Sequence, residues 1–250
     1  MKININDIIQ ASLEAGDAIL KIYETGDFNV EMKADNSPLT LADKASHQII
    51  KEKLSKLYPE IPILSEEGKE IPFEERKNWE YFWLVDPLDG TKEFIKKNGE
   101  FTVNIALIKE KYPVLGVIYA PVLDTLYYAE PGRGAFKKVA DAEEEPIRVA
   151  ETPAEGVIAV KSRSHSSDDE VEILKQWNIV DSISKGSSLK FCMVAEGKAH
   201  IYYRHGPTWE WDTGAGQAIV EGAGGTVTVN GDRLFYNKPV IKNGSFLVKN

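Results

Sequence analysis

The sequence is nearly free of cysteine and has no long apolar run, and each absence excludes a class of protein. Cys192 is the single cysteine among 250 residues, which excludes an internal disulfide and a zinc site made of several cysteines. No stretch reaches the ~20 apolar residues that a membrane-spanning helix needs. Residues 1–23 carry charges where a signal peptide has its apolar core. We therefore expect a cytoplasmic protein without integral membrane contact; peripheral association with the inner membrane stays open.

The charge balance is acidic, with 39 Asp and Glu residues against 30 Lys and Arg and a formal net charge of −9. A polyanion would be repelled on average, and the basic residues form no stripe, so we expect no nucleic-acid partner. A surplus of carboxylates also fits a protein that binds divalent cations, because the bound ions would offset that charge.

The periodicity of apolar residues predicts alternating helices and strands. Residues 5–23 and 40–57 have the pattern of amphipathic helices, and 61–64 and 81–85 that of short strands. An antiparallel meander is predicted at 102–108, 114–121, 125–130 and 135–139. Further strands are predicted at 156–161, 178–184, 199–204, 226–229 and 245–249, and helices at 168–177, 187–197 and 213–225. These elements predict an α/β protein of stacked layers. The charged loop 141–146 divides it into halves 1–145 and 146–250.

The stretch FWLVDPLDGT (82–91) places two carboxylates three residues apart, directly after an apolar run. Pro87 stiffens the segment and favours an extended conformation at Asp86. Carboxylates on such a turn are the hard oxygen ligands that Mg²⁺ takes, and the Leu88 carbonyl lies between Asp86 and Asp89 as another oxygen. The segment therefore predicts metal ligands at the end of a buried strand.

Further candidate residues lie where other predicted elements begin or end. Glu66 and Glu67 follow a short strand, and Asp212 begins a helix of small residues where a ligand and the backbone can come close. Gly90 and Thr91 begin a predicted helix, whose free N–H groups and positive dipole end can receive a phosphate.

Each of these residues also has a purely structural interpretation. Asp and Pro are common in turns, and acidic pairs are usually solvated. Thr40-x-x-Asp43 approximates a capping box, which by itself accounts for both residues. Taken singly, the structural interpretation is the better one for each residue. A turn alone, however, does not explain Asp, Pro, apolar, Asp, Gly, Thr in that order after a buried strand.

The combination of motifs resembles the inositol monophosphatase superfamily of magnesium-dependent, lithium-sensitive phosphatases. The motifs are Glu66-Glu67, DPLDGT (86–91) and Trp211-Asp212 followed after eleven residues by Gly224-Gly225. The resemblance covers nearly the whole chain and implies a layered α-β-α-β-α sandwich. It also implies that the first half carries most metal ligands, and that the second supplies Asp212 and a site for a second phosphate.

Three segments resemble the bacterial 3'(2'),5'-bisphosphate nucleotidase branch of that superfamily more closely. They are DPLDGTKEFIKKNGEFTVNIALI (86–108), GSSLKFCMVAEG (186–197) and RHGPTWEWD (204–212). The sequence departs from the family pattern at Trp209, where methionine is expected, and at Gly214, where alanine is expected. Neither position is a metal ligand.

The resemblance implies two Mg²⁺ ions, or three. The implied ligands are Glu66, Asp86, the Leu88 carbonyl, Asp89 and Asp212. Asp86 would be shared by the two ions. Glu67 would orient Glu66 or help bind a third ion through water. Asp43 and Thr91 would position and activate the attacking water, and the Gly90 and Thr91 N–H groups would receive the phosphate.

The implied substrate is a small phosphorylated nucleotide. Lys190 is the candidate for its second phosphate, with Ser188 and the adjacent helix N-terminus adding hydrogen bonds and Arg204 a further candidate. The implied reaction is hydrolysis of the 3'-phosphate of adenosine 3',5'-bisphosphate to AMP and phosphate, in sulfur and nucleotide metabolism. The sulfated nucleotide 3'-phosphoadenylyl sulfate is a second implied substrate.

Two alternatives share the same metal ligands. One is an inositol monophosphatase, with or without fructose-1,6-bisphosphatase activity, which differs only around the second phosphate. The other is a metal-binding regulatory scaffold that catalyses nothing. The oligomeric state, monomer or homodimer, is open.

Overall fold

The structure of the chain is a computed structural model that describes residues 3–33, 38–164 and 168–250. Its helices are α1 (Ile5–Thr25), α2 (Leu41–Leu57), α3 (Phe73–Arg76), α4 (Thr91–Ile95), α5 (Asp168–Leu174), α6 (Leu189–Ala195), α7 (Gly214–Gly222) and the 3₁₀ turn η1 (Pro121–Leu123). The first sheet contains β3 (Ile63–Ser65), β4 (Tyr81–Asp89), β5 (Thr102–Lys109), β6 (Tyr112–Ala120), β7 (Thr125–Glu130), β8 (Gly134–Val139) and β9 (Glu145–Ile147). The second contains β10 (Val157–Ser162), β11 (Ile179–Lys185), β12 (Ile201–Arg204), β14 (Thr226–Val229), β15 (Asp232–Arg233) and β17 (Phe246–Lys249). Two short pairs are β1 (Glu31–Met32) with β2 (Pro38–Leu39) and β13 (Thr208–Trp209) with β16 (Lys242–Asn243).

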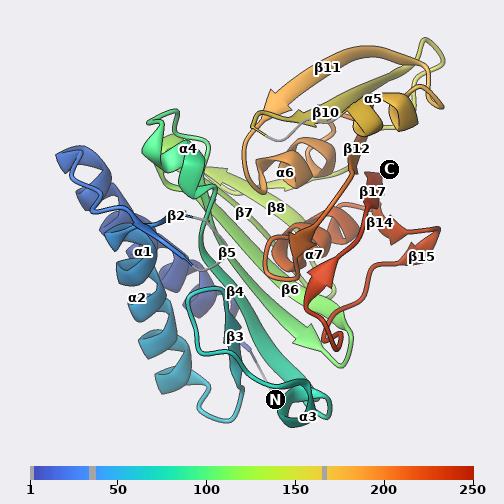
Figure 1. Cartoon of the computed structure of the whole chain (residues 1–250). Coiled ribbons are helices and arrows are strands. Elements are labelled where there is room, and N and C mark those ends of the chain that lie inside the picture. Colours follow the sequence, from blue (N-terminus) through green and yellow to red (C-terminus); the bar gives the residue numbers. More distant parts are fainter. Residues whose placement is uncertain (1–2, 34–37, 165–167) are drawn as a thin grey trace.

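The elements stack in five layers, as Figure 1 shows. Helices α1 and α2 cover one face of the first sheet, and α7 covers the other face with α6 beside it. The second sheet lies on α6. Val160 and Tyr202 face α6 in the main core, whereas their neighbours Ala159 and Ile201 face α5 in a smaller cluster, so α5 lies on the opposite face. The predicted α-β-α-β-α sandwich is confirmed.

The first sheet is the predicted meander with one parallel strand added. Its order follows the chain from β3 to β9; β3 pairs parallel with β4, and every later pair is antiparallel. The charged loop 141–146 runs into β9, so the first sheet ends at Ile147 and the second begins at Val157. The division at residue 145 stays a prediction, and α7 packs against the first sheet although it belongs to the second half.

The helices begin and end where their sequences provide caps. The side chain of Asn4 accepts a hydrogen bond from the Asn6 N–H at the start of α1, and Gly26 ends that helix in the left-handed conformation with φ of 74°. Thr40 and Asp43 form the predicted capping box of α2. Helices α5 and α6 are shorter than predicted, because segments 175–177 and 196–197 leave the helix as turns. Among the described residues, no helix has both the length and the apolar character needed to cross a membrane.

Strand β4 differs from the prediction because it does not end at Asp86. It continues to Asp89 through an irregular segment in which Asp86 pairs with Asn104 and Asp89 with Thr102. Two residues therefore face one on β5, as in a β-bulge, a distortion common next to active sites. The apolar run before it is continuous because β4 is buried on both faces: Phe82 faces the α7 side and Trp83 faces the α1 side.

Close contact between α7 and the first sheet depends on a glycine in β6. A Cβ atom on Gly116 would lie 2.6 Å from the Ala215 carbonyl oxygen and 2.7 Å from the Ala218 Cβ. Both contacts are too short for a relaxed structure. Helix α7 begins two residues after Asp212, so this packing also fixes one of the candidate ligands.

We predict that Gly116→Ala lowers the free energy of unfolding by about 1–3 kcal/mol, the usual cost of overpacking a core. Urea denaturation would measure the change. Gly244→Ala is the matched control, because a Cβ there meets no heavy atom within 4 Å, and it should change stability by less than about 0.5 kcal/mol. Equal stability of both variants would contradict the packing argument.

Candidate active site

The bulge at the end of β4 fixes two of the predicted metal ligands. Asp86 is 1 % exposed, and its Oδ1 accepts a hydrogen bond from the Leu88 N–H at 3.1 Å. The Ser46 hydroxyl of α2 donates to the Pro87 carbonyl at 2.7 Å. These contacts hold the bend between Asp86 and Asp89 against the helical layer, so neither carboxylate depends on a loose loop for its position.

Glycine is required directly after the bulge. Gly90 has φ of 90°, and a Cβ on it would lie 3.2 Å from the Ser187 Cβ and 3.4 Å from the Glu100 carbonyl oxygen. Thr91 then begins the five-residue helix α4. The segment therefore brings β4 against the 186–190 region of the second half.

Asp43 caps α2 and also contacts Thr91, its predicted partner in the site. One oxygen, Oδ2, accepts hydrogen bonds from the Thr40 N–H at 2.7 Å and the Thr40 hydroxyl at 2.5 Å, which completes the helix cap. The other, Oδ1, accepts the Thr91 hydroxyl proton at 3.2 Å. Burial raises the pKa of the Asp43 carboxyl, although the Thr40 hydrogen bonds act in the opposite direction. The predicted pairing of Asp43 with Thr91 is present.

Asp212 is carried by a tight turn at residues 209–212. Its Oδ2 accepts the Trp209 N–H at 2.8 Å, and its own N–H donates to the Trp209 carbonyl at 3.2 Å. Trp209, which departs from the family pattern, stacks on Trp211 with ring centroids 5.4 Å apart. The turn fixes one Asp212 oxygen, and helix α7 follows directly.

Glu66 and Glu67 share a cation supplied by the chain itself. The Lys33 ammonium lies 2.8 Å from a Glu66 oxygen and 2.5 Å from a Glu67 oxygen. Burial raises the pKa of Glu66, and Lys33 opposes that shift. The two carboxylates thus form a site that already holds one positive charge.

The carboxylates act on one another electrostatically across the site. Burial raises the pKa of Asp86 well above its usual range, and repulsion by Glu66, Asp89 and Asp212 adds to the shift. The pKa of Asp212 is also raised well above its usual range, first by burial and then by repulsion from Asp89 and Glu66. A set of buried carboxylates that cannot all be ionised at low cost is a natural site for a cation.

Hard divalent cations fit these residues by donor chemistry, because oxygen is the only donor type that they offer. In the geometry of residues 3–33, 38–164 and 168–250, no three Asp, Glu, His or Cys side chains lie close enough to hold one ion. Each carboxylate has a local partner instead, as the contacts above describe. The convergence of Glu66, Asp86, Asp89 and Asp212 on shared metal ions therefore stays a prediction.

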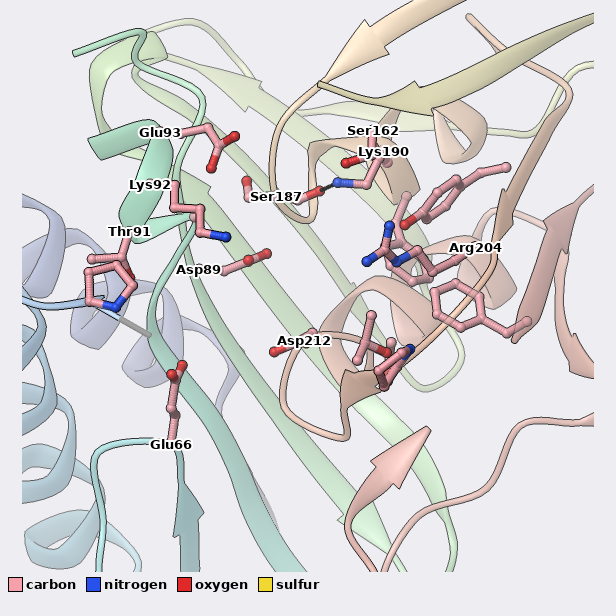
Figure 2. A pocket seen from close by; sticks show the side chains of 18 residues that line it. Glu66, Asp89, Thr91, Lys92, Glu93, Ser162, Ser187, Lys190, Arg204 and Asp212 are labelled. Carbon is pink, nitrogen blue, oxygen red and sulfur yellow. Dashed lines mark hydrogen bonds between the residues drawn. The ribbon is translucent and has the colours of Figure 1, made fainter. Parts of the chain in front are cut away.

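A cavity of about 310 Å³ lies between the end of β4 and the second sheet. Glu66, Asp89 and Asp212 point into it, and Lys190 and Arg204 line it on the side of the second sheet, as Figure 2 shows. Lys92 and Glu93 of α4 also line it. One pocket thus brings together three of the predicted metal ligands and both predicted anion-binding cations.

Lys190 is held in place within the cavity wall. Its ammonium donates to the Ser187 carbonyl at 2.6 Å and lies 5.6 Å from the centroid of the Tyr202 ring. Burial lowers the pKa of Lys190, the Asp89 charge opposes that shift, and Arg204 adds to it. Arg204 itself pairs with the Glu170 carboxylate at 3.2 Å. An anion bound beside Lys190 would stabilise the Lys190 charge, which burial and Arg204 disfavour.

The segment that carries Lys190 is anchored to the first half by Glu100. The Glu100 carboxylate accepts the Gly186 N–H at 2.8 Å and two Arg163 hydrogen bonds at 2.6 and 2.9 Å, and it pairs with Lys185 at 3.0 Å. These contacts fix the distance between the bulge of β4 and the start of α6.

Ser188 has contacts other than those the sequence suggested. Its hydroxyl is buried, donates to Asp89 Oδ2 at 2.7 Å and accepts from the Asn104 amide at 2.7 Å. Ser187 lines the cavity instead. Ser188 therefore positions a carboxylate in this structure, and its predicted contact with a phosphate stays a prediction.

Sequence reasoning missed several residues of the site. Asn104, Ser187, Glu93 and Tyr202 all contact or line it. The sequence gives a signal for Asn104. Its amide lies within the apolar strand run TVNIALI, so it is expected to be buried and to need a hydrogen-bond partner.

Comparison with known proteins places the chain among similar sequences and structures. A model of the inositol monophosphatase family matches residues 4–250. The 3'(2'),5'-bisphosphate nucleotidases CysQ of Salmonella typhimurium and Escherichia coli K12 are 49 % and 47 % identical over 224 residues, which cover 89 % of this chain and of each relative. The crystal structure of CysQ from Bacteroides thetaiotaomicron, described as a bacterial member of the inositol monophosphatase family, has a TM-score of 0.85 and 44 % identity. It covers 98 % of this chain and 96 % of that chain.

The raised carboxyl pKa values of Asp86 and Asp212 predict how stability depends on pH. A raised pKa in the folded state adds stability below the ordinary value near 4, and this stability is lost as the pH rises through the raised value. Metal-free protein should therefore lose stability from about pH 4 upward, and Mg²⁺ should raise Tm more at about pH 8 than at about pH 5.

Differential scanning calorimetry with chelator and with Mg²⁺ would measure both effects. Asp212→Asn is the control, because removing one acid should reduce the Mg²⁺-induced rise in Tm. A rise that is equal at both pH values would contradict the electrostatic argument.

Proposed function

This chain belongs to the inositol monophosphatase family, and on that basis we propose that it is a 3'(2'),5'-bisphosphate nucleotidase. It hydrolyses the 3'-phosphate of adenosine 3',5'-bisphosphate to AMP and phosphate. The observation that carries the proposal is the pair Lys190 and Arg204, which face Asp89 and Asp212 across one cavity. A second phosphate needs a cationic site at a distance from the reacting one, and this pair supplies it.

The reacting phosphate lies at the acidic end of the cavity in this proposal. Glu66, Asp86, Asp89, Asp212 and the Leu88 carbonyl would hold two Mg²⁺ ions, or three with Glu67. Bound Mg²⁺ would lower the pKa of a water molecule and offset charge on the phosphoryl oxygens. The Gly90 and Thr91 N–H groups would receive the phosphate.

Thr91 and Asp43 orient and deprotonate the attacking water. The Thr91 hydroxyl donates a hydrogen bond to Asp43 Oδ1, so its oxygen can accept a hydrogen bond from water. As the water loses a proton to the Thr91 oxygen, the Thr91 hydroxyl proton passes to Asp43, whose pKa is raised by burial. Asp43 then releases that proton to solvent. The water oxygen bonds to phosphorus as the bond to the ribose 3'-oxygen breaks, and the leaving oxygen takes up a proton from solvent.

The 5'-phosphate lies against Lys190 and Arg204. The Ser187 carbonyl and the Tyr202 ring hold the Lys190 ammonium in place before the substrate arrives, which reduces the entropy lost on binding. Lys190 is buried, and Arg204 is half-buried and also pairs with the Glu170 carboxylate at 3.2 Å. An inositol monophosphatase would have no use for a second anion site at these residues. The sulfated nucleotide presents an anion in the same position and is a second substrate of this proposal. A cytoplasmic location, the division into halves and the oligomeric state stay predictions from the sequence.

A substrate panel tests the proposed activity. We expect kcat/KM with Mg²⁺ to be highest for adenosine 3',5'-bisphosphate, lower for inositol 1-phosphate and fructose 1,6-bisphosphate, and lost with chelator. Release of inorganic phosphate would be measured. A preference for either sugar phosphate would favour the alternative family activity, and an absence of turnover on every substrate would favour the regulatory scaffold.

Replacing Lys190 tests the second-phosphate site. Lys190→Ala should raise KM for adenosine 3',5'-bisphosphate about 10- to 100-fold, because a charge-assisted hydrogen bond contributes about 1.5–3 kcal/mol. The effect should be much smaller for adenosine 3'-phosphate, which has no 5'-phosphate. The matched control is Lys175→Ala, at a lysine whose side chain is 66 % exposed and pairs with Glu172 on the surface. Equal changes in KM for the two nucleotides would reject this role for Lys190.

A further inference from the structure

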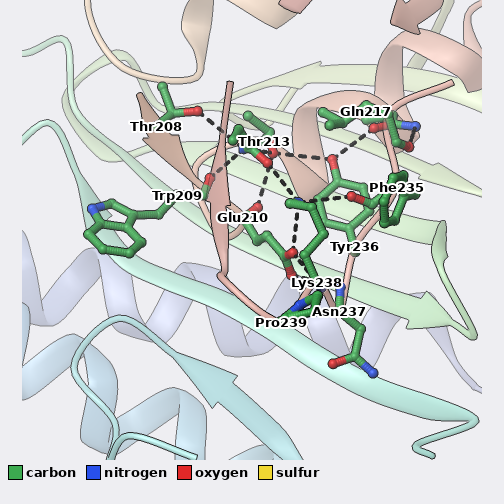
Figure 3. Close-up of polar contacts among 12 residues, drawn as sticks. Thr208, Trp209, Glu210, Thr213, Gln217, Phe235, Tyr236, Asn237, Lys238 and Pro239 are labelled. Atoms are coloured by element: carbon green, nitrogen blue, oxygen red, sulfur yellow. Dashed lines mark hydrogen bonds and ion pairs between the residues drawn. The ribbon is translucent and has the colours of Figure 1, made fainter. Parts of the chain in front are cut away.

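A fully buried carboxylate lies directly behind the turn that carries Asp212. Glu210 is 0 % exposed, and its two oxygens accept three hydrogen bonds from the segment 237–238. The Asn237 N–H lies 2.8 Å from Oε2, the Lys238 N–H lies 3.0 Å from Oε1, and the Lys238 ammonium lies 2.7 Å from Oε1. Figure 3 shows this cluster beside Thr213 and Trp209.

The backbone of Glu210 is fixed as firmly as its side chain. Its N–H donates to the Ile241 carbonyl at 3.0 Å, and its carbonyl accepts the Thr213 N–H at 3.2 Å and the Gly214 N–H at 3.1 Å. The Thr213 hydroxyl donates to the same carbonyl at 3.1 Å. Glu210 therefore connects three parts: the turn of Asp212, the start of α7 and the segment 237–241.

The segment 237–239 is held from the first half of the chain by Arg76 at the end of α3. Arg76 is 3 % exposed; its Nη1 donates to Asn237 Oδ1 at 2.7 Å and its Nη2 to the Pro239 carbonyl at 3.1 Å. The Asn237 amide donates back to the Arg76 carbonyl at 2.7 Å. The segment thus joins two anchors, one on Arg76 and the other on Glu210.

A buried ion pair is a weak source of stability, because the cost of desolvation offsets much of the Coulomb attraction. An apolar side chain at this position would avoid the desolvation cost but would leave the Asn237 and Lys238 N–H groups without this acceptor. The Glu210 carboxylate instead fixes the position of the 209–212 turn. Three donors converge on this one group, and any displacement of the turn would leave some of them without a partner. This arrangement fixes geometry more than it adds stability.

We propose that Glu210 is a positioning residue that orients the Asp212 carboxylate toward Asp86 and Asp89. The inference rests on the proposed function only in taking Asp212 as a metal ligand. Two constraints act on the same turn: Trp209 holds one Asp212 oxygen from within the turn, and Glu210 holds the turn itself from behind. Removing the second constraint lets the carboxylate rotate away while its own chemistry is unchanged.

Glu210→Gln in the full-length chain is the test, because it preserves the size of the side chain. The amide keeps one acceptor oxygen, turns an NH₂ group toward a backbone N–H and loses the charge that pairs with Lys238. We expect the Kd for Mg²⁺, measured by titration calorimetry without substrate, to rise about tenfold, as for other residues that orient metal ligands. Raising the Mg²⁺ concentration should restore kcat, and KM for the nucleotide at saturating Mg²⁺ should stay unchanged.

Two further variants keep the test decisive. Lys238→Met removes the ammonium but leaves both backbone donors, so it should raise the Mg²⁺ Kd less than Glu210→Gln does. If Glu210→Gln fails to fold, Lys238→Met tests the same contact. Glu221→Gln is the matched control, because it removes the charge of a carboxylate on α7, away from the Asp212 turn, that accepts Arg233 hydrogen bonds of 2.8 and 2.6 Å. It should leave the Mg²⁺ Kd unchanged.

The outcomes separate this role from the proposed function. Suppose that Asp212→Asn binds Mg²⁺ more weakly, whereas Glu210→Gln has a lower Tm but an unchanged Mg²⁺ Kd. That result would overturn the positioning role alone, and Glu210 would be a structural residue. An unchanged Kd in Asp212→Asn would overturn the metal assignment and the positioning role with it. An equal loss of affinity in Glu221→Gln would also overturn the proposal, because the effect would then not be specific to the turn.

Discussion

Repulsion between buried carboxylates is the constraint on which the rest of this structure depends. Asp89 repels both Asp86 and Asp212, and burial makes each charge more costly to hold. Small backbone movements would relieve that repulsion, so the fold has to prevent them. The bulge of β4 is fastened to α2 through Ser46, and the turn of Asp212 is fastened behind by Glu210. Rigid packing of both faces of the first sheet is thus a requirement of the site as well as a source of stability.

Much of this arrangement could be predicted because its signals are local. The apolar run before Asp86 predicts a buried strand, which the structure shows as β4. The helix predicted to begin at Gly90 and Thr91 is α4. The capping box of α2 was predicted from the sequence in the same way. The sequence could not show that the Asp43 carboxylate makes two contacts at once. One oxygen accepts the Thr40 N–H of the helix cap, and the other accepts the Thr91 hydroxyl, whereas the capping-box motif accounts for only the first.

What could not be predicted is contact between distant segments. Ser188 meets Asn104 across 84 residues, and Arg76 meets Asn237 across 161. Neither pairing leaves a periodic pattern in the sequence, because each joins single positions on different elements. The sequence gives one indication of such contacts: a polar side chain within an apolar run is buried and needs a hydrogen-bond partner. The run does not identify that partner. The same limit explains why the sequence could not show that the Ser188 hydroxyl contacts Asp89.

The predicted metal ligands and the predicted anion-binding cations lie mostly on different parts of the chain. Asp89 ends β4 and Thr91 begins α4, whereas Lys190 and Arg204 belong to α6 and β12, and all four line one cavity. Segment 186–190 reaches the first half mainly through the Glu100 cluster and the contacts of Ser188, so its pocket-lining side chains can vary while β4 is unchanged. Asp212 is the exception, because it belongs to the second half and lies with the acids of the first. Its turn is also held by a separate buried carboxylate, that of Glu210. Asp212 therefore has two anchors, the packing of α7 on the first sheet at Gly116 and the Glu210 carboxylate behind its turn.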